Sequence, residues 1–138
     1  DHGPIMVTVE YEIDEKDGPD FREALEKLRI FRYQNGVVQW SFFVDIADPR
    51  LYREVYFEES WGAHLRHHER VTSFETQVAT KVYEYHRGEG MPKVFHYAVC
   101  DSRFPLEPGA RPQAAPTPRE YETDSRGIPL WFVDDLHE

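Results

Sequence analysis

The chain has 138 residues, a length that fits one domain with a single hydrophobic core. Hydrophobic residues make up 40% of the chain and aromatic residues 14%, which excludes a generally disordered protein. The formal net charge of -10 repels phosphate backbones and anionic lipids, so no nucleic-acid partner is expected.

Cys100 is the only cysteine, so the chain forms no internal disulfide and offers no cysteine-based zinc site. The apolar stretches, of which residues 40–46 are an example, are far shorter than the ~20 residues of a membrane-spanning helix. These features predict a water-soluble domain in a reducing, cytoplasmic environment.

The first hundred residues show a regular succession of strand and helix patterns. Alternating apolar residues predict a strand over 5–13, and apolar residues at helical spacing predict a helix from Gly18-Pro19 to about Arg32. Two further alternating runs, 38–44 and 51–57, flank the turn former Asp48-Pro49 and predict a hairpin.

The second half of this region repeats the succession. Ser60 is a predicted cap for a short helix ending at Arg70, and a second apolar stripe follows Thr72 in a helical region expected to end at Gly88 or Gly90. Residues 93–100 alternate again and predict a last strand. The order β-α-β-β-α-β is typical of a ferredoxin-like α+β fold, in which a four-stranded antiparallel sheet carries helices on one face.

The second face of such a sheet lacks helices. We expect Trp40, Phe42 and other large apolar side chains to lie there, where they form a patch too large to remain in water. The simplest cover for this patch is a second copy of the chain, which predicts a homodimer.

A composition change near Asp101 indicates a boundary between a domain at 1–104 and a tail at 105–138. Six of the ten prolines lie beyond residue 104, and residues 105–118 show no periodicity. We expect this stretch to be extended and the end of the tail to be anchored by Leu130, Trp131 and Phe132.

The string ESWGAHLRHHERVT at residues 59–72 carries a family resemblance. It resembles the antibiotic-biosynthesis-monooxygenase superfamily of dimeric α+β barrels. More narrowly, ESW-x-x-HLR-x-HERVT is similar to the C-terminal domain that follows the membrane part of some bacterial major-facilitator exporters. The resemblance covers about residues 5–100 and implies sheet-to-sheet dimers.

The resemblance implies an accessory or ligand-binding domain without catalytic activity, attached to a transporter and thereby tethered to the inner membrane. The first residue, Asp1, fits a domain cut from a longer protein. The coding sequence upstream of Asp1 tests this expectation, because an exporter would contribute roughly a dozen apolar spans there.

Trp61 opens the predicted helix where haem-degrading members of the superfamily place a tryptophan against their ligand. Those enzymes also use an asparagine on the first strand, and residues 5–13 contain none. Haem degradation therefore lacks a required residue, and no cofactor is expected. The alternative role of Trp61 is to fill the seam between helix and sheet.

Three histidines, His64, His67 and His68, lie at i, i+3 and i+4. One helix face could present only two of these imidazoles to a metal ion, and the sequence offers no further ligand at a recognisable spacing. We therefore expect no metal site and no effect of chelators on stability. We expect His67 to be solvated or paired with Glu69. His64 and His68 share the helix face of Trp61 and are the candidate acid and base of a site.

The alternative function is that of a cofactor-free monooxygenase acting on an aromatic, phenolic small molecule. The resemblance implies an apolar cleft with one or two polar groups for such a reaction. Candidate catalytic residues are Trp61, His64 and His68. Candidate ligand-binding residues are Trp40, Phe42 and Phe57, with Arg66 holding an anionic oxygen unless it pairs with Glu58 or Glu69.

Overall fold

The computed structural model describes residues 3–101, 103, 125 and 128. Four strands and three α-helices follow one another in the order β-α-β-β-α-α-β. They are β1 (Ile5–Glu12), α1 (Gly18–Gln34), β2 (Val37–Val44), β3 (Leu51–Glu58), α2 (Trp61–Arg70), α3 (Ser73–Glu84) and β4 (Lys93–Ala98), with a short 3-10 helix η1 (Glu15–Asp17) before α1.

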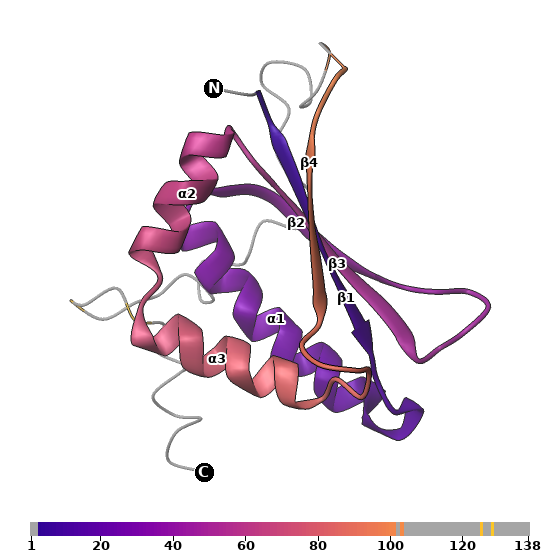
Figure 1. The fold of residues 1–138 in the computed structure, drawn as a ribbon. Helices are drawn as coiled ribbons and strands as arrows, with labels where there is room; N and C mark the ends of the chain where they lie inside the picture. Colours follow the sequence, from indigo (N-terminus) through magenta and orange to yellow (C-terminus); the bar gives the residue numbers. More distant parts are fainter. Residues whose placement is uncertain (1–2, 102, 104–124, 126–127, 129–138) are drawn as a thin grey trace.

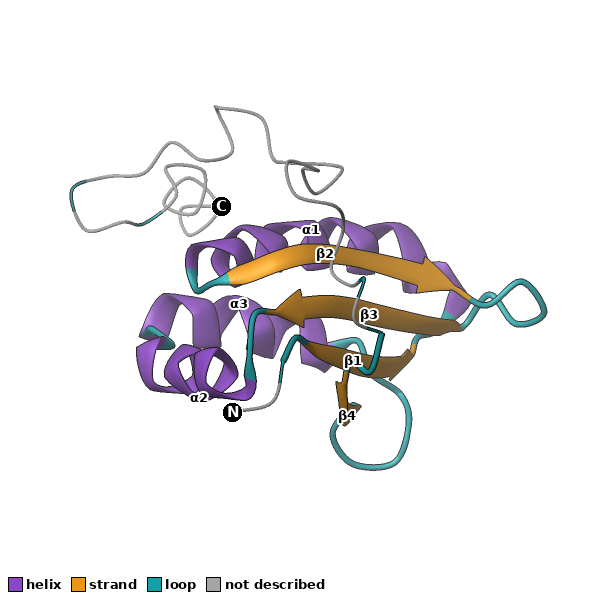
Figure 2. Ribbon diagram, turned by 90° about the horizontal axis from the view of Figure 1, so that it is seen from above, coloured by secondary structure: helices purple, strands orange, loops and turns teal. Residues whose placement is uncertain are grey.

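The strands form one antiparallel sheet in the order β2-β3-β1-β4. The three helices lie on the same side of this sheet, and the β2–β3 hairpin projects beyond the body (Figure 1). Figure 2 shows the other face of the sheet without a helix. The predicted ferredoxin-like α+β fold is therefore confirmed.

α2 and α3 begin where the sequence predicts, because polar side chains satisfy their first amide groups, whereas α1 begins at Gly18-Pro19 without a side-chain cap. Ser60 accepts a hydrogen bond from the amide of Ala63 at α2, and Thr72 accepts one from Glu75 at α3. The expected end of α3 at Gly88 or Gly90 is wrong. α3 ends at Glu84, because His86 turns away from the helix to form a β-bridge with Ile13.

The hydrophobic core lies between the sheet and the helices. Its β1 residues alternate as predicted, with Val7, Val9 and Tyr11 almost fully buried against Phe21 and Leu25 of α1. Ile128 from the C-terminal segment is also buried in this core. The predicted anchors Leu130, Trp131 and Phe132 lie outside the described residues.

The expected position of Trp40 and Phe42 on the uncovered sheet face is wrong. A bulge between Val37 and Gln39 sets the β2 register, and Trp40 pairs with Tyr56 on the helix side of the sheet. Trp40 is buried there, and Phe42 packs against it at a ring centroid distance of 5.5 Å.

The uncovered sheet face nevertheless carries exposed apolar side chains, although these come from other residues than expected. Phe43 and Leu51 are exposed at one end of it, and Phe95 and Tyr97 are exposed on β4. Every residue of β4 is exposed. The open face therefore combines an edge strand with exposed aromatic side chains.

Candidate functional site

The predicted site residues of α2 come together around His64. The ring centroid of His64 lies 5.1 Å from that of Trp61 and 4.6 Å from that of His68. Trp61 keeps 37% of its surface exposed, whereas His64 is buried. The cluster therefore reaches from the surface into the layer between helix and sheet.

A fourth aromatic ring, that of His96 on β4, completes this cluster. Its centroid lies 4.8 Å from His64 and 5.6 Å from Trp61. His96 is not among the predicted site residues, because alternation along β4 does not show which face of the strand lies toward α2. The only available signal was the antiparallel pairing of β4 with β1, which places His96 opposite Val7 on the helix side.

Two imidazoles of this cluster and Glu58 form a chain of polar contacts. His64 Nδ1 lies 3.0 Å from Glu58 Oε1, and His64 Nε2 lies 3.0 Å from His68 Nε2. Burial, followed by the charge of His64, lowers the pKa of His68 and of His96 below the usual value. His68 and His96, the outer histidines of the cluster, are therefore neutral at pH 7 and can accept or pass on a proton.

His67 is not solvated and is not paired with Glu69, contrary to expectation. It is buried between Glu58 on β3 and Glu75 on α3, with ring nitrogens at 3.2 Å from an oxygen of each. The helix period turns His67 toward α3 and the sheet, and the two carboxylates replace the water that it would otherwise bind.

The polar contacts continue into the core. Glu75 accepts a hydrogen bond of 2.7 Å from Asn35 and lies 3.6 Å from Arg32. Arg32 also pairs with Glu54 at 3.1 Å. Although burial opposes the charge of Arg32, Glu54 raises the pKa of its guanidinium.

Glu54 is fully buried and satisfied by three donors. Besides Arg32, the hydroxyl of Tyr11 donates to it at 2.9 Å and the indole of Trp40 donates at 2.8 Å. Burial, followed by the charge of Glu54, raises the pKa of Tyr11 well above its usual value. Trp40 is thus a structural donor rather than part of an open ligand site.

The predicted ligand-binding residues do not form one cleft. Trp40 and Phe42 lie on the helix side of the sheet, whereas Phe57 lies on the open side. Arg66 is exposed on α2, and the position expected for it beside Glu58 is taken by His64 and His67.

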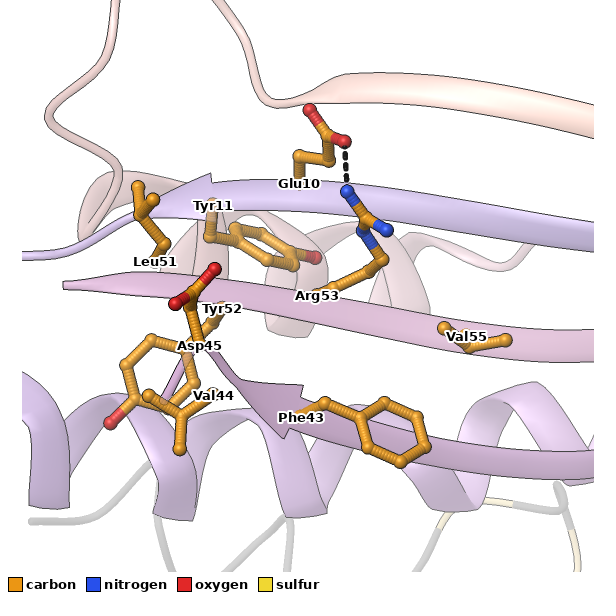
Figure 3. Close-up of a pocket in the computed structure, with 9 residues that line it drawn as sticks. All are labelled: Glu10, Tyr11, Phe43, Val44, Asp45, Leu51, Tyr52, Arg53 and Val55. Atoms are coloured by element: carbon orange, nitrogen blue, oxygen red, sulfur yellow. Dashed lines mark hydrogen bonds and ion pairs between the residues drawn. The ribbon is translucent and has the colours of Figure 1, made fainter. Parts of the chain in front are cut away.

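The open sheet face carries a hollow of about 450 Å³ near the β2–β3 hairpin. Phe43, Leu51 and Val55 supply apolar lining, and Arg53 pairs with Glu10 across β3 and β1 (Figure 3). A second hollow of about 500 Å³ adjoins it and shares Glu10 and Leu51. Both hollows are open depressions of the surface.

Within the described part of the chain, no three or more His, Cys, Asp or Glu residues are arranged to hold a metal ion. The expected indifference to chelators stays a prediction. No helix in the described ranges is long and apolar enough to cross a membrane.

Solved structures with a similar fold show the class of protein that this chain resembles. A proposed antibiotic biosynthesis monooxygenase from Caulobacter crescentus superposes with a TM-score of 0.62 at 14% identity, covering 72% of this chain and 92% of that one. SnoaB, a cofactor-independent oxygenase from Streptomyces nogalater, gives a TM-score of 0.54 at 11% identity, covering 72% and 94%. A conserved protein from Methanosarcina mazei gives 0.60 at 11%, covering 70% and 93%.

These structures share the fold of the antibiotic-biosynthesis-monooxygenase-like class, as the sequence predicts. The family itself is narrower. Residues 1–103 match the family model described as transmembrane secretion effector, and the chain belongs to this family. Among curated protein sequences, none matches the chain.

Proposed function

We propose that this chain is a homodimeric accessory domain of a bacterial membrane exporter, able to bind a small molecule and without catalytic activity of its own. Membership in the transmembrane secretion effector family supports the exporter context. The observation that carries the dimer is the helix-free sheet face with its exposed aromatic side chains, Phe43, Phe95 and Tyr97.

The interior supports a role without catalysis. Part of the layer between the helices and the sheet is occupied by an ionic network, in which Glu54 accepts from Tyr11, Arg32 and Trp40. Such networks fix side chains in one arrangement and leave no apolar cleft at these residues for a polycyclic substrate. The hollow beside Phe43 is the better place for a ligand, and the second protomer would close it.

Sedimentation velocity on the full chain tests the dimer. Phe95→Glu places a charge on the exposed sheet face, so we expect it to weaken self-association at least tenfold. Met91→Glu is the matched control, because Met91 is exposed in the segment before β4 rather than on the sheet. A wild-type chain that remains monomeric at micromolar concentration would refute the dimer.

The exporter context has its own test. The coding sequence upstream of Asp1 is expected to encode roughly a dozen apolar spans of membrane length. A start codon directly before Asp1 would contradict tethering while leaving the dimer proposal intact.

The second candidate function is cofactor-free oxidation of a phenolic small molecule. It is favoured by the partly exposed cluster of Trp61, His64, His68 and His96, whose outer imidazoles are available as neutral bases. SnoaB, which shares the fold, is described as a cofactor-independent oxygenase.

Oxygen consumption with phenolic and quinol substrates separates the two candidates. The accessory role predicts no uptake above that of a buffer control. Uptake that is lost in His68→Ala and Trp61→Ala, but kept in the exposed-site variant Met91→Glu, would establish the enzyme instead.

A further inference from the structure

Helix α2 is attached to the body in an unusual way. Among the described residues, none of those forming the hydrophobic core or packed against it comes from α2. Two of its large apolar side chains, Trp61 and Leu65, are 37% and 46% exposed. Its buried side chains include two histidines, His64 and His67.

These histidines hold α2 through carboxylates on two other elements. Glu58 Oε1 on β3 is shared by His64 Nδ1 at 3.0 Å and His67 Nδ1 at 3.2 Å. Glu75 Oε1 on α3 lies 3.2 Å from His67 Nε2. The stability of an apolar interface does not depend on pH, whereas the stability of this interface depends on the protonation states of its histidines and carboxylates.

The geometry specifies the protonation state of His67. Both of its ring nitrogens face carboxylate oxygens, and both can donate only when the imidazole is protonated. A neutral ring would turn one nitrogen lone pair against a buried carboxylate. The same arrangement favours an ionised Glu58, because Oε1 faces two ring nitrogens and a proton on its other oxygen, Oε2, would find no acceptor among the described residues.

The charges around His67 increase the effect that its protonation has on the packing of α2. Three buried carboxylates, Glu54, Glu58 and Glu75, are balanced by Arg32 on α1 and by His67 when it is charged. His64 and His68 lie on the same helix, and His96 of β4 faces His64. Deprotonation of His67 would remove one of the cations that the described residues place beside these carboxylates.

We propose that α2 is a protonation-controlled latch, which is closed while His67 is charged and Glu58 is ionised and which opens when either group is neutralised. The α2 latch consists of His64 and His67 together with Glu58 and Glu75. It is a device of this chain alone and does not depend on the association or function proposed above.

The direction of the pH dependence follows from the shifts of the two central groups. Burial opposes the charge of each group, but hydrogen bonds outweigh it. The contacts with Glu58 and Glu75 raise the pKa of His67, and the contacts with His67 and His64 lower the pKa of Glu58. The contribution of His67 is complete below the ordinary pKa of ~6.5 and is lost as pH rises through its raised pKa. The contribution of Glu58 is present above its ordinary pKa of ~4.3 and is lost as pH falls through its lowered pKa.

Amide hydrogen exchange on the full chain between pH 5 and pH 10, corrected for intrinsic rates, tests the latch. We expect residues 61–70 to lose protection by about tenfold or more on the alkaline side, because the contacts that hold α2 through the charged His67 are lost there. Residues 18–34 of α1 should remain protected over the same range, because they are held by the apolar core.

Three variants make the test specific. Glu58→Gln keeps a carbonyl oxygen for both imidazoles but removes the anion at every pH, so α2 should be weakly protected over the whole range and lose the wild-type transition. His67→Gln should leave α2 weakly protected at every pH. Glu69→Gln removes the same charge from an exposed position of α2 and should leave the transition where it is.

Two results would overturn the proposal. One is α2 protection that does not change between pH 5 and pH 10, or that changes together with that of α1. The other is a Glu58→Gln variant with the wild-type transition, and this variant decides the matter even if His67→Gln does not fold.

Discussion

At the scale of single residues, the unusual feature is a chain of buried ionisable groups. Glu54, Glu58 and Glu75 are almost completely removed from water, although glutamate is rarely buried unless it is paired. Each lies within hydrogen-bond reach of a cation or of a neutral donor. Removal of one member should therefore cost more than the mean value of a hydrogen bond.

Glu54→Ala tests this expectation. The change leaves the guanidinium of Arg32 short of its main partner and leaves Trp40 and Tyr11 without an acceptor, so we expect unfolding free energy to fall by about 3–5 kcal/mol. Urea unfolding measures it. Glu10→Ala breaks an exposed pair with Arg53 and should cost less than about 1 kcal/mol. A similar loss for both variants would show that the buried network adds nothing special.

At the scale of elements, the helices differ in what holds them. α1 and α3 contribute core residues such as Leu25, Val78 and Val82, whereas α2 depends on polar contacts. The stability of α3 should therefore be coupled to global unfolding, and its cap should matter to the whole domain.

Thr72→Ala removes the hydroxyl that accepts the Glu75 amide at the start of α3. We expect the unfolding free energy to fall by about 1 kcal/mol, because the amide of the buried residue Glu75 would lose its acceptor. Thr80→Ala is the control, since its hydroxyl only donates to Thr76 O on the exposed side of α3. Thermal or chemical unfolding that shows no difference between these variants would contradict the capping role.

At the scale of the whole molecule, Ile128 of the C-terminal segment contributes to the hydrophobic core of the domain. Ile128 is 5% exposed and is part of the core cluster, although more than twenty residues separate it from β4. Ile128 thus joins the core formed by residues before the predicted boundary near residue 104, and the division into a domain and a tail stays a prediction.

Ile128→Ala should lower the unfolding free energy by about 2 kcal/mol or more, because it removes buried methyl groups and leaves a cavity. Truncation after Arg103 should lower the melting temperature further. Ser125→Ala changes an exposed residue of the same segment and should have no effect. If the truncated chain melts at the wild-type temperature and associates in the same way, the segment is only a linker.

The sequence by itself determined the order of the elements, the buried face of β1, the caps Ser60 and Thr72, and the family string around His64. These features are local, because alternation, helical spacing and capping act over a few residues. The gathering of Trp61, His64 and His68 also followed from one helix face.

Only the tertiary structure decided which face of the sheet each β2 and β3 side chain occupies. A bulge near Val37 reverses alternation for the rest of β2, and no residue type there signals it. The same register buries Glu54 and Glu58, whose charge predicts exposure from sequence alone. Their partners Arg32, Trp40, His64 and His67 come from three other elements, so the cost of burial is offset only after those elements have packed together.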